Sequence, residues 1–217
     1  YAPNPTQAVH AFCHCVPRQW HQMSVILSAA ASLHWLSGLL KISVAELVDI
    51  APAGQRETAP VFLPYLNGER TPHNDAAAKG VFYGMTAAHG AAHLAYGVME
   101  GVAFAMADGY AALQDAGTTL DAAAFMGGGS RSAFWGRLCA SVLGFHLNRN
   151  EGSETGAALG AARLARLAHG HEDLSAVFVA PRVLDRYEPE PVGRAMLETR
   201  LARYRRLYRA LRLEFQT

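Results

Sequence analysis

Apolar and polar positions alternate in short runs along this chain and recur at helical spacing in longer ones. Residues 9–16 and 20–25 alternate on either side of Pro17-Arg18-Gln19, which predicts a β-hairpin. Apolar runs bounded by turn residues predict further strands over 62–66, 79–85, 120–126 and 143–149. Helical spacing predicts helices over 26–40, 44–50, 90–114, 133–143, 154–168 and 197–215. The alternation of strands with helices indicates an α/β fold, with an irregular stretch over 181–191.

Two of these helices carry distinctive faces. The helix over 90–114 is apolar on almost every side, so we expect it to be buried. The helix over 197–215 carries an apolar packing stripe, formed by Leu197, Leu201, Tyr204, Tyr208, Leu211 and Phe215. Its arginines lie mostly off the stripe and predict a solvated basic face; they are Arg200, Arg203, Arg205, Arg206, Arg209 and Arg212. One alternative function is therefore a non-catalytic association module that binds a partner through either helix.

Composition narrows the choice of function. A length of 217 residues, 51% of them hydrophobic, is enough for one or two globular domains and a sizeable core. The net charge is +1. The balanced charge argues against nucleic acid as the main partner. No apolar run is long enough to span a membrane. The three cysteines do not form a disulfide framework, so we expect a cytoplasmic protein. The opening residues read like an internal stretch of a longer chain.

A cluster of histidines and cysteines near the start resembles a metal-binding set. It consists of His10, Cys13, His14, Cys15 and His21. The spacing does not match zinc sites, which pair one Cys-x₂₋₄-Cys with a second, distant pair. We therefore expect buried cysteines and ordinary strand histidines here, and no metal ligands.

The strongest candidate for binding chemistry is a glycine-rich turn between the strand over 120–126 and the helix over 133–143. Its residues are Gly127, Gly128, Gly129, Ser130, Arg131 and Ser132. Glycine lacks a Cβ, so the backbone can approach a ligand closely, and the N–H groups of the following helix favour phosphate or other polar nucleotide atoms. Ser130 or Ser132 can serve as the helix N-cap. A tight turn without a ligand is the alternative, and the spacing excludes a dinucleotide fingerprint.

The helix over 154–168 is rich in small residues near its start, including Gly156 and Gly160. Small side chains allow either a second backbone or a flat ligand to come close, and composition does not decide between them. The aspartates are scattered, and none has a context that marks it as a catalytic base. The chain therefore shows a candidate nucleotide site without catalytic residues of its own.

Several motifs, taken in order, resemble the FGGY family of carbohydrate kinases. Gly80-x-Phe82-x-Gly84-Met85, then His93-Leu94 and Val98-Met99-Glu100, is similar to the family's second signature, with Gly97 standing where the family usually has alanine or serine. The stretches 10–14, 20–30, 62–74, 127–132 and 157–165 resemble the xylulokinase branch of this family.

This resemblance implies a ribonuclease-H-like, actin-like ATPase fold, of which residues 1–217 would be the C-terminal, nucleotide-side domain without its first strands. It implies ATP and Mg²⁺ as cofactors, D-xylulose as the sugar and a homodimer as the assembly. Residues 127–132 would contact the nucleotide, whereas the aspartate base would lie in an N-terminal domain. We therefore expect this chain to be inactive by itself. Gluconate, ribulose or glycerol kinases of the same family are the nearest alternatives.

Overall fold

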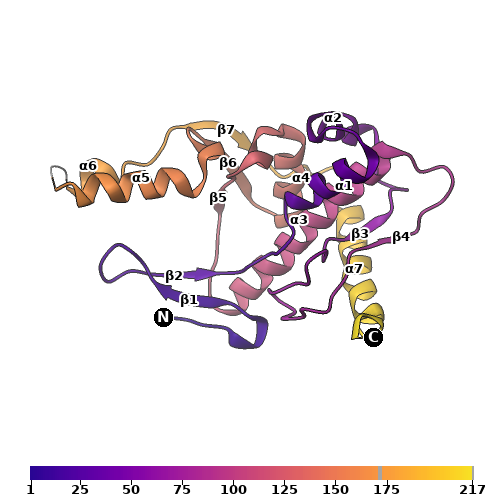
Figure 1. The fold of residues 1–217 in the computed structure, drawn as a ribbon, viewed down its shortest axis with the longest axis horizontal. Coiled ribbons are helices and arrows are strands. Elements are labelled where there is room, and N and C mark those ends of the chain that lie inside the picture. Colours follow the sequence, from indigo (N-terminus) through magenta and orange to yellow (C-terminus); the bar gives the residue numbers. More distant parts are fainter. Residues whose placement is uncertain (171–172, 217) are drawn as a thin grey trace. The chain divides into compact units, whose positions relative to one another are not determined.

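The computed structural model describes residues 1–170 and 173–216 and contains two compact units (Figure 1). Unit 1 combines Tyr1–Thr119 with Glu190–Thr217, and unit 2 consists of Leu120–Pro189. In the described part of the chain, no helix is both long enough and apolar enough to cross a lipid bilayer.

Unit 1 is built around one long helix. Its elements are β1 (His10–Cys13), β2 (Trp20–Met23), α1 (Ala31–Leu40), α2 (Val44–Ile50), β3 (Val61–Leu63), β4 (Val81–Tyr83), α3 (Ala91–Asp115) and α7 (Arg194–Leu211). Helix α3 is buried over most of its length, as its apolar sequence predicts, and it contacts α1, α2, β3 and α7. Its faces are thus occupied within the unit and do not form a free surface for a partner. Strands β1 and β2 form the predicted antiparallel hairpin, and β3 pairs antiparallel with β4.

The close packing of α3 on β3 depends on a glycine. A Cβ at Gly101 would overlap the carbonyl oxygen of Phe62, which belongs to the backbone of β3 and cannot rotate away. Phe62 is 1% exposed, and its ring centroid lies 4.4 Å from the ring centroid of Phe82. The absence of a side chain at position 101 therefore lets helix and strand share one apolar core.

Helix α7 places its apolar stripe against the rest of unit 1, with Leu197, Tyr204 and Tyr208 buried. The expectation that its arginines form a solvated face is wrong for Arg200. This side chain is 5% exposed and pairs with the buried carboxylate of Glu100 on α3. The physical reason is that a charged group enters a core when an opposite charge satisfies it there.

The loop after β3 fastens several distant parts of unit 1 by buried polar groups. Oε1 of Glu69 accepts hydrogen bonds from the backbone N–H groups of Leu27, at 3.0 Å, and Arg70, at 2.9 Å. The hydroxyl of Tyr208 donates to Asp75 at 2.9 Å. This loop thereby joins the segment before α1 to helix α7.

Unit 2 is a small mixed sheet with helices. Its elements are β5 (Ala122–Ala124), α4 (Ala133–Leu143), β6 (His146–Asn150), α5 (Ala157–Ala168), α6 (Leu174–Val177) and β7 (Val183–Tyr187). The strand order is β5-β6-β7, with β5 parallel and β7 antiparallel to β6. The prediction of an irregular stretch over 181–191 is wrong, because β7 lies within it. Prolines at positions 181, 189 and 191 mark the ends of this edge strand and obscured its short alternating core.

Two smaller predictions also need correction. Cys13 and Cys15 are exposed, whereas Cys139 alone among the three cysteines is buried. A hairpin of two strands covers little surface, so its cysteines remain open to solvent. The first helix begins at Ala31, five residues after the predicted start at position 26. The backbone before it is held by hydrogen bonds to the 67–75 loop instead of helical ones, for example at Leu27.

Candidate functional site

The glycine turn follows β5 directly and forms a short 3₁₀ segment over Gly128–Arg131. Gly127 has a φ of +85°, a conformation that residues with side chains rarely adopt. A Cβ at Gly127 or at Gly128 would meet nothing within 4 Å. Open space therefore borders the backbone of the turn, as a site of ligand approach requires.

Serines close the turn and begin the helix after it. The Ser130 hydroxyl donates to the Gly127 carbonyl at 2.8 Å, and Ser130 is fully buried. The Ser132 hydroxyl accepts the backbone N–H of Trp135 at 3.1 Å, so Ser132, one of the two predicted candidates, is the N-cap of α4. Ser130 thus shapes the turn from within, while Arg131 is exposed beside it.

A second turn lies beside the first because β5 and β6 are parallel neighbours. Their carboxyl ends lie at the same edge of the sheet, where ligands of open α/β sheets commonly bind. The N–H of Gly127 donates to the carbonyl of Ser153 at 2.8 Å. The Ser153 hydroxyl in turn accepts the N–H of Asn150 at 2.8 Å. Two turns from separate parts of the sequence therefore form one connected wall.

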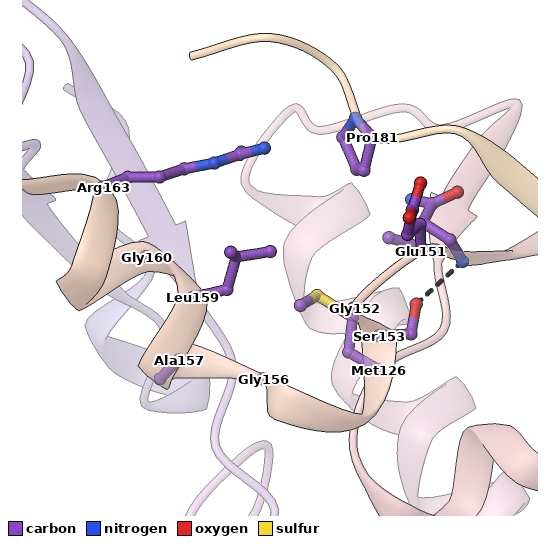
Figure 2. Close-up of a pocket in the computed structure, with 12 residues that line it drawn as sticks. Met126, Glu151, Gly152, Ser153, Gly156, Ala157, Leu159, Gly160, Arg163 and Pro181 are labelled. Atoms are coloured by element: carbon purple, nitrogen blue, oxygen red, sulfur yellow. Dashed lines mark hydrogen bonds between the residues drawn. The ribbon is translucent and has the colours of Figure 1, made fainter. Parts of the chain in front are cut away.

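A pocket of about 490 Å³ opens at this edge of the sheet, within the usual size range for small-molecule sites (Figure 2). Its lining is formed by Ala124, Met126, Asn150, Glu151, Gly152, Ser153, Gly156, Ala157, Leu159, Gly160, Arg163 and Pro181. The small residues at the start of α5 border open space, since a Cβ at Gly160 would meet nothing within 4 Å. Helix α5 buries none of its residues. Gly156 and Gly160, the small residues for which composition left two roles open, both line this pocket.

The polar groups of the pocket lie around its apolar floor. Arg163 extends along the rim, where its guanidinium donates to the carbonyl of Val179 at 2.9 Å (Figure 2). Glu151 is exposed on the opposite side. The side-chain oxygen of Asn150 is buried and has no hydrogen-bond partner within residues 1–170 and 173–216. The site thus offers apolar surface, backbone amides and one cation, a combination that suits a base, a sugar and a phosphate.

Of the residues that the sequence singled out, Gly156 and Gly160 line this pocket, whereas the glycine turn 127–132 lies beside it. The glycine turn was predicted, but the segment 150–153 and the residues Arg163 and Pro181 were not, because their roles depend on strand pairing. The parallel arrangement of the strands on either side of α4 was the available signal. The predicted residues Gly127–Ser132 lie next to Met126 at the pocket edge, and their contact with a ligand stays a prediction.

The fold is of the ribonuclease-H-like, actin-like ATPase class found in sugar kinases, as predicted, and solved kinases share it over nearly the whole chain. A structure from Brucella ovis described as a xyloylose kinase superposes with a TM-score of 0.89 at 41% identity, covering 98% of this chain and 44% of the other. A gluconate kinase of Lactobacillus acidophilus gives a TM-score of 0.76 at 27% identity, covering 93% of this chain and 42% of the other.

The chain belongs to the FGGY family of carbohydrate kinases. Residues 1–169 match the C-terminal domain of that family. The xylulose kinase of Escherichia coli is 42% identical over 215 residues, which is 97% of this chain and 44% of the relative. The chain thus spans less than half of the length of the relatives it matches.

Proposed function

We propose that this chain supplies the nucleotide-binding side of a xylulose kinase, which transfers the γ-phosphoryl group of ATP to D-xylulose and yields D-xylulose 5-phosphate. The similarity to xylulose kinases at 41–42% identity supports this choice of sugar. The observation that carries the nucleotide role is the open glycine backbone at Gly127–Gly128, which lies beside the pocket at the carboxyl ends of β5 and β6.

The residues of this chain would bind and orient the nucleotide. Phosphoryl transfer depends chiefly on positioning and on stabilisation of charge, so a rigid wall for the nucleotide is a substantial contribution. The apolar floor at Leu159 and Met126 suits the base and ribose, and Arg163 supplies a positive charge at the rim. The aspartate that would accept the sugar proton is assigned to a part of the enzyme outside residues 1–217. We therefore expect no turnover of sugar by this chain alone.

The residues of the pocket fit an adenine nucleotide in volume and chemistry, but they do not form a metal site. Among residues 1–170 and 173–216, no cluster of three or more His, Cys, Asp or Glu side chains is placed to hold a metal ion. Mg²⁺ is commonly held through substrate phosphates, waters and one or two carboxylates. We accordingly assign Mg²⁺ to the complete enzyme with its nucleotide.

A second candidate is another sugar kinase of the same family. The match to a gluconate kinase structure at 27% identity and to the glycerol kinase of Dechloromonas aromatica at 34% identity supports it. The two candidates are separated by extending the chain to the full length of its relatives and assaying that protein with D-xylulose, gluconate, ribulose and glycerol. Preference for a sugar other than D-xylulose would overturn the first candidate. A homodimer remains part of the proposal and is tested by light scattering of the same protein.

Tryptophan fluorescence tests the nucleotide role directly. The ring of Trp135 lies against the turn, since a Cβ at Gly129 would be 3.0 Å from it. Titration of Mg-ADP into the chain should change the fluorescence with saturation, and Trp135→Phe should abolish the signal while the other two tryptophans remain. Gly128→Val, whose side chain would point into open space, should weaken binding and leave the fold intact. An unchanged signal at millimolar nucleotide would contradict the proposal.

A further inference from the structure

The glycine turn gains from support outside itself because its glycines are costly to order. Three consecutive glycines have more accessible backbone conformations than any other three residues, and ordering them costs correspondingly more entropy. Hydrogen bonds hold the turn from Gly127 to Ser153, from the N–H and the hydroxyl of Ser130 to Gly127, and from the N–H of Ser132 to Gly129. None of these restrains the carbonyl of Ser130, where the turn passes toward the N-cap of α4.

Tyr187, the last residue of β7, supplies that restraint. Its hydroxyl donates to the Ser130 carbonyl at 3.2 Å, and the side chain is 5% exposed. Its ring lies edge-on to Phe125, just before the turn, with 6.3 Å between ring centroids. The same ring covers Gly136 in α4 so closely that a Cβ there would overlap it. One side chain thereby contacts the residues before, within and after the glycine turn.

We propose that Tyr187 is a positioning residue for nucleotide binding, acting through the backbone of the glycine turn and without touching the nucleotide. The proposal rests on the nucleotide role of this turn. It follows from the geometry because Tyr187 is not among the residues that line the pocket, yet its hydroxyl holds the carbonyl three residues after Gly127. The strand that carries Tyr187 is thus a functional part of the site as well as an edge of the sheet.

The hydroxyl and the ring make separable contributions. In Tyr187→Phe the ring still fills the space over Gly136, while the hydrogen bond to Ser130 and the contact of the hydroxyl with Arg149 are lost. We expect the dissociation constant for Mg-ADP to rise about 3- to 10-fold, the factor that corresponds to one neutral hydrogen bond. Amide hydrogen exchange at residues 127–132 should also become faster. In Tyr187→Leu, the loss of the ring should weaken binding further and lower the melting temperature.

Tyr208→Phe provides a matched control. Tyr208 is also 5% exposed and also donates a buried hydrogen bond, to Asp75, but it lies in unit 1. Its replacement should lower the melting temperature while the dissociation constant for Mg-ADP and the exchange at residues 127–132 stay unchanged. Loss of stability alone therefore does not imitate the expected result.

The experiment separates failure of the inference from failure of the proposed function. If the unaltered chain binds Mg-ADP and Tyr187→Phe binds it equally well, the positioning role is overturned and the nucleotide role stands. If the unaltered chain does not bind Mg-ADP, both are overturned. Weaker binding by Tyr187→Phe together with faster exchange in the turn, and neither change in Tyr208→Phe, supports the inference.

Discussion

Arg200 on α7 and Glu100 on α3 lie 100 residues apart in sequence and form a buried ion pair between the two helices. Nε of Arg200 lies 2.8 Å and 2.9 Å from the two carboxylate oxygens, and Nη2 donates to the carbonyl of Ala59 at 3.0 Å. Burial raises the pKa of Glu100, and Arg200 opposes that shift. The pair therefore fixes the position of α7 against α3 only while both charges are present.

Removal of one partner from this pair should be strongly destabilising. In Arg200→Met the carboxylate of Glu100 loses its counter-charge, and we expect the free energy of unfolding to fall by about 3–5 kcal/mol. Denaturant titration measures the loss. Arg203→Met, an exposed neighbour on the same helix, should change stability by less than about 0.5 kcal/mol. Equal stabilities of the two variants would show that the ion pair contributes nothing.

Glycine at position 101 should be required for packing, whereas glycine at position 38 should not. A Cβ at Gly101 overlaps the backbone of β3, so Gly101→Ala should cost about 1–3 kcal/mol through overpacking. Gly38 is an exposed residue of α1, and a Cβ there would meet nothing within 4 Å. Gly38→Ala should therefore stabilise by up to about 1 kcal/mol through helix propensity. Thermal unfolding of both variants gives the two signs, and a gain in stability for Gly101→Ala would refute the account.

Two neighbouring groups of the 67–75 loop should respond to pH in opposite directions. Burial raises the pKa of Glu69 from 4.5 to about 7, although two backbone N–H groups partly offset the shift. Burial lowers the pKa of His73 from 6.5 to about 4. Between pH 4.5 and 7 the folded protein retains the Glu69 proton that the unfolded chain releases, so this carboxyl makes unfolding easier as pH rises. Between pH 4 and 6.5 the unfolded chain binds the His73 proton more strongly, so this imidazole makes unfolding harder as pH rises.

Comparison with Glu69→Gln isolates the first effect. The amide retains an oxygen for the N–H groups of Leu27 and Arg70 but does not titrate. The free energy of unfolding of the unaltered chain minus that of Glu69→Gln should fall as the pH rises from about 4.5 to 7 and then level off. The corresponding difference for His73→Phe should rise from about pH 4 to 6.5. Denaturant titrations across this range measure both, and flat difference curves would rule out these shifts.

A larger side chain on helix α5 should obstruct the pocket. Gly160 lines the pocket and Ala165, on the opposite face of the same helix, is exposed and does not line it. Gly160→Leu should fill part of the volume and weaken binding of Mg-ADP at least tenfold, while Ala165→Leu should leave it unchanged. Both variants retain helix-forming residues, so circular dichroism should show equal helix content. Undiminished binding by Gly160→Leu would place the nucleotide elsewhere.

Local sequence patterns predicted most helices and strands because the pattern of each lies within one continuous stretch of the chain. The hairpin, α2 and the long buried α3 follow directly from alternation and helical spacing. Strand β7 was missed because its pattern is short and flanked by prolines, and only its pairing with β6 makes it a strand. Arg200 was predicted to be solvated because its partner, Glu100, is distant in sequence. The apolar stripe of a helix does not show which of the neighbouring charged residues forms an ion pair.

In the candidate site, too, local features could be predicted from the sequence and long-range contacts could not. The glycines 127–129 are a local feature and were found in the sequence, which also limited the N-cap to Ser130 or Ser132; the hydrogen bond to Trp135 identifies Ser132. The rest of the wall, at residues 150–153, depends on the parallel pairing of β5 with β6. Tyr187 depends on the additional pairing of β7. Such contacts arise from sheet topology, which residue spacing alone does not specify.

The single buried cysteine offers a chemical measure of how unit 2 opens. Cys139 lies in α4, the helix that starts at the glycine turn, and burial raises the pKa of its thiol to about 12. With serine at the two exposed positions, Cys13 and Cys15, a thiol reagent can reach the protein only when α4 leaves its packing. The rate of labelling then reports the frequency of local opening, and its slowing by a bound ligand would give the affinity of that ligand without any optical signal.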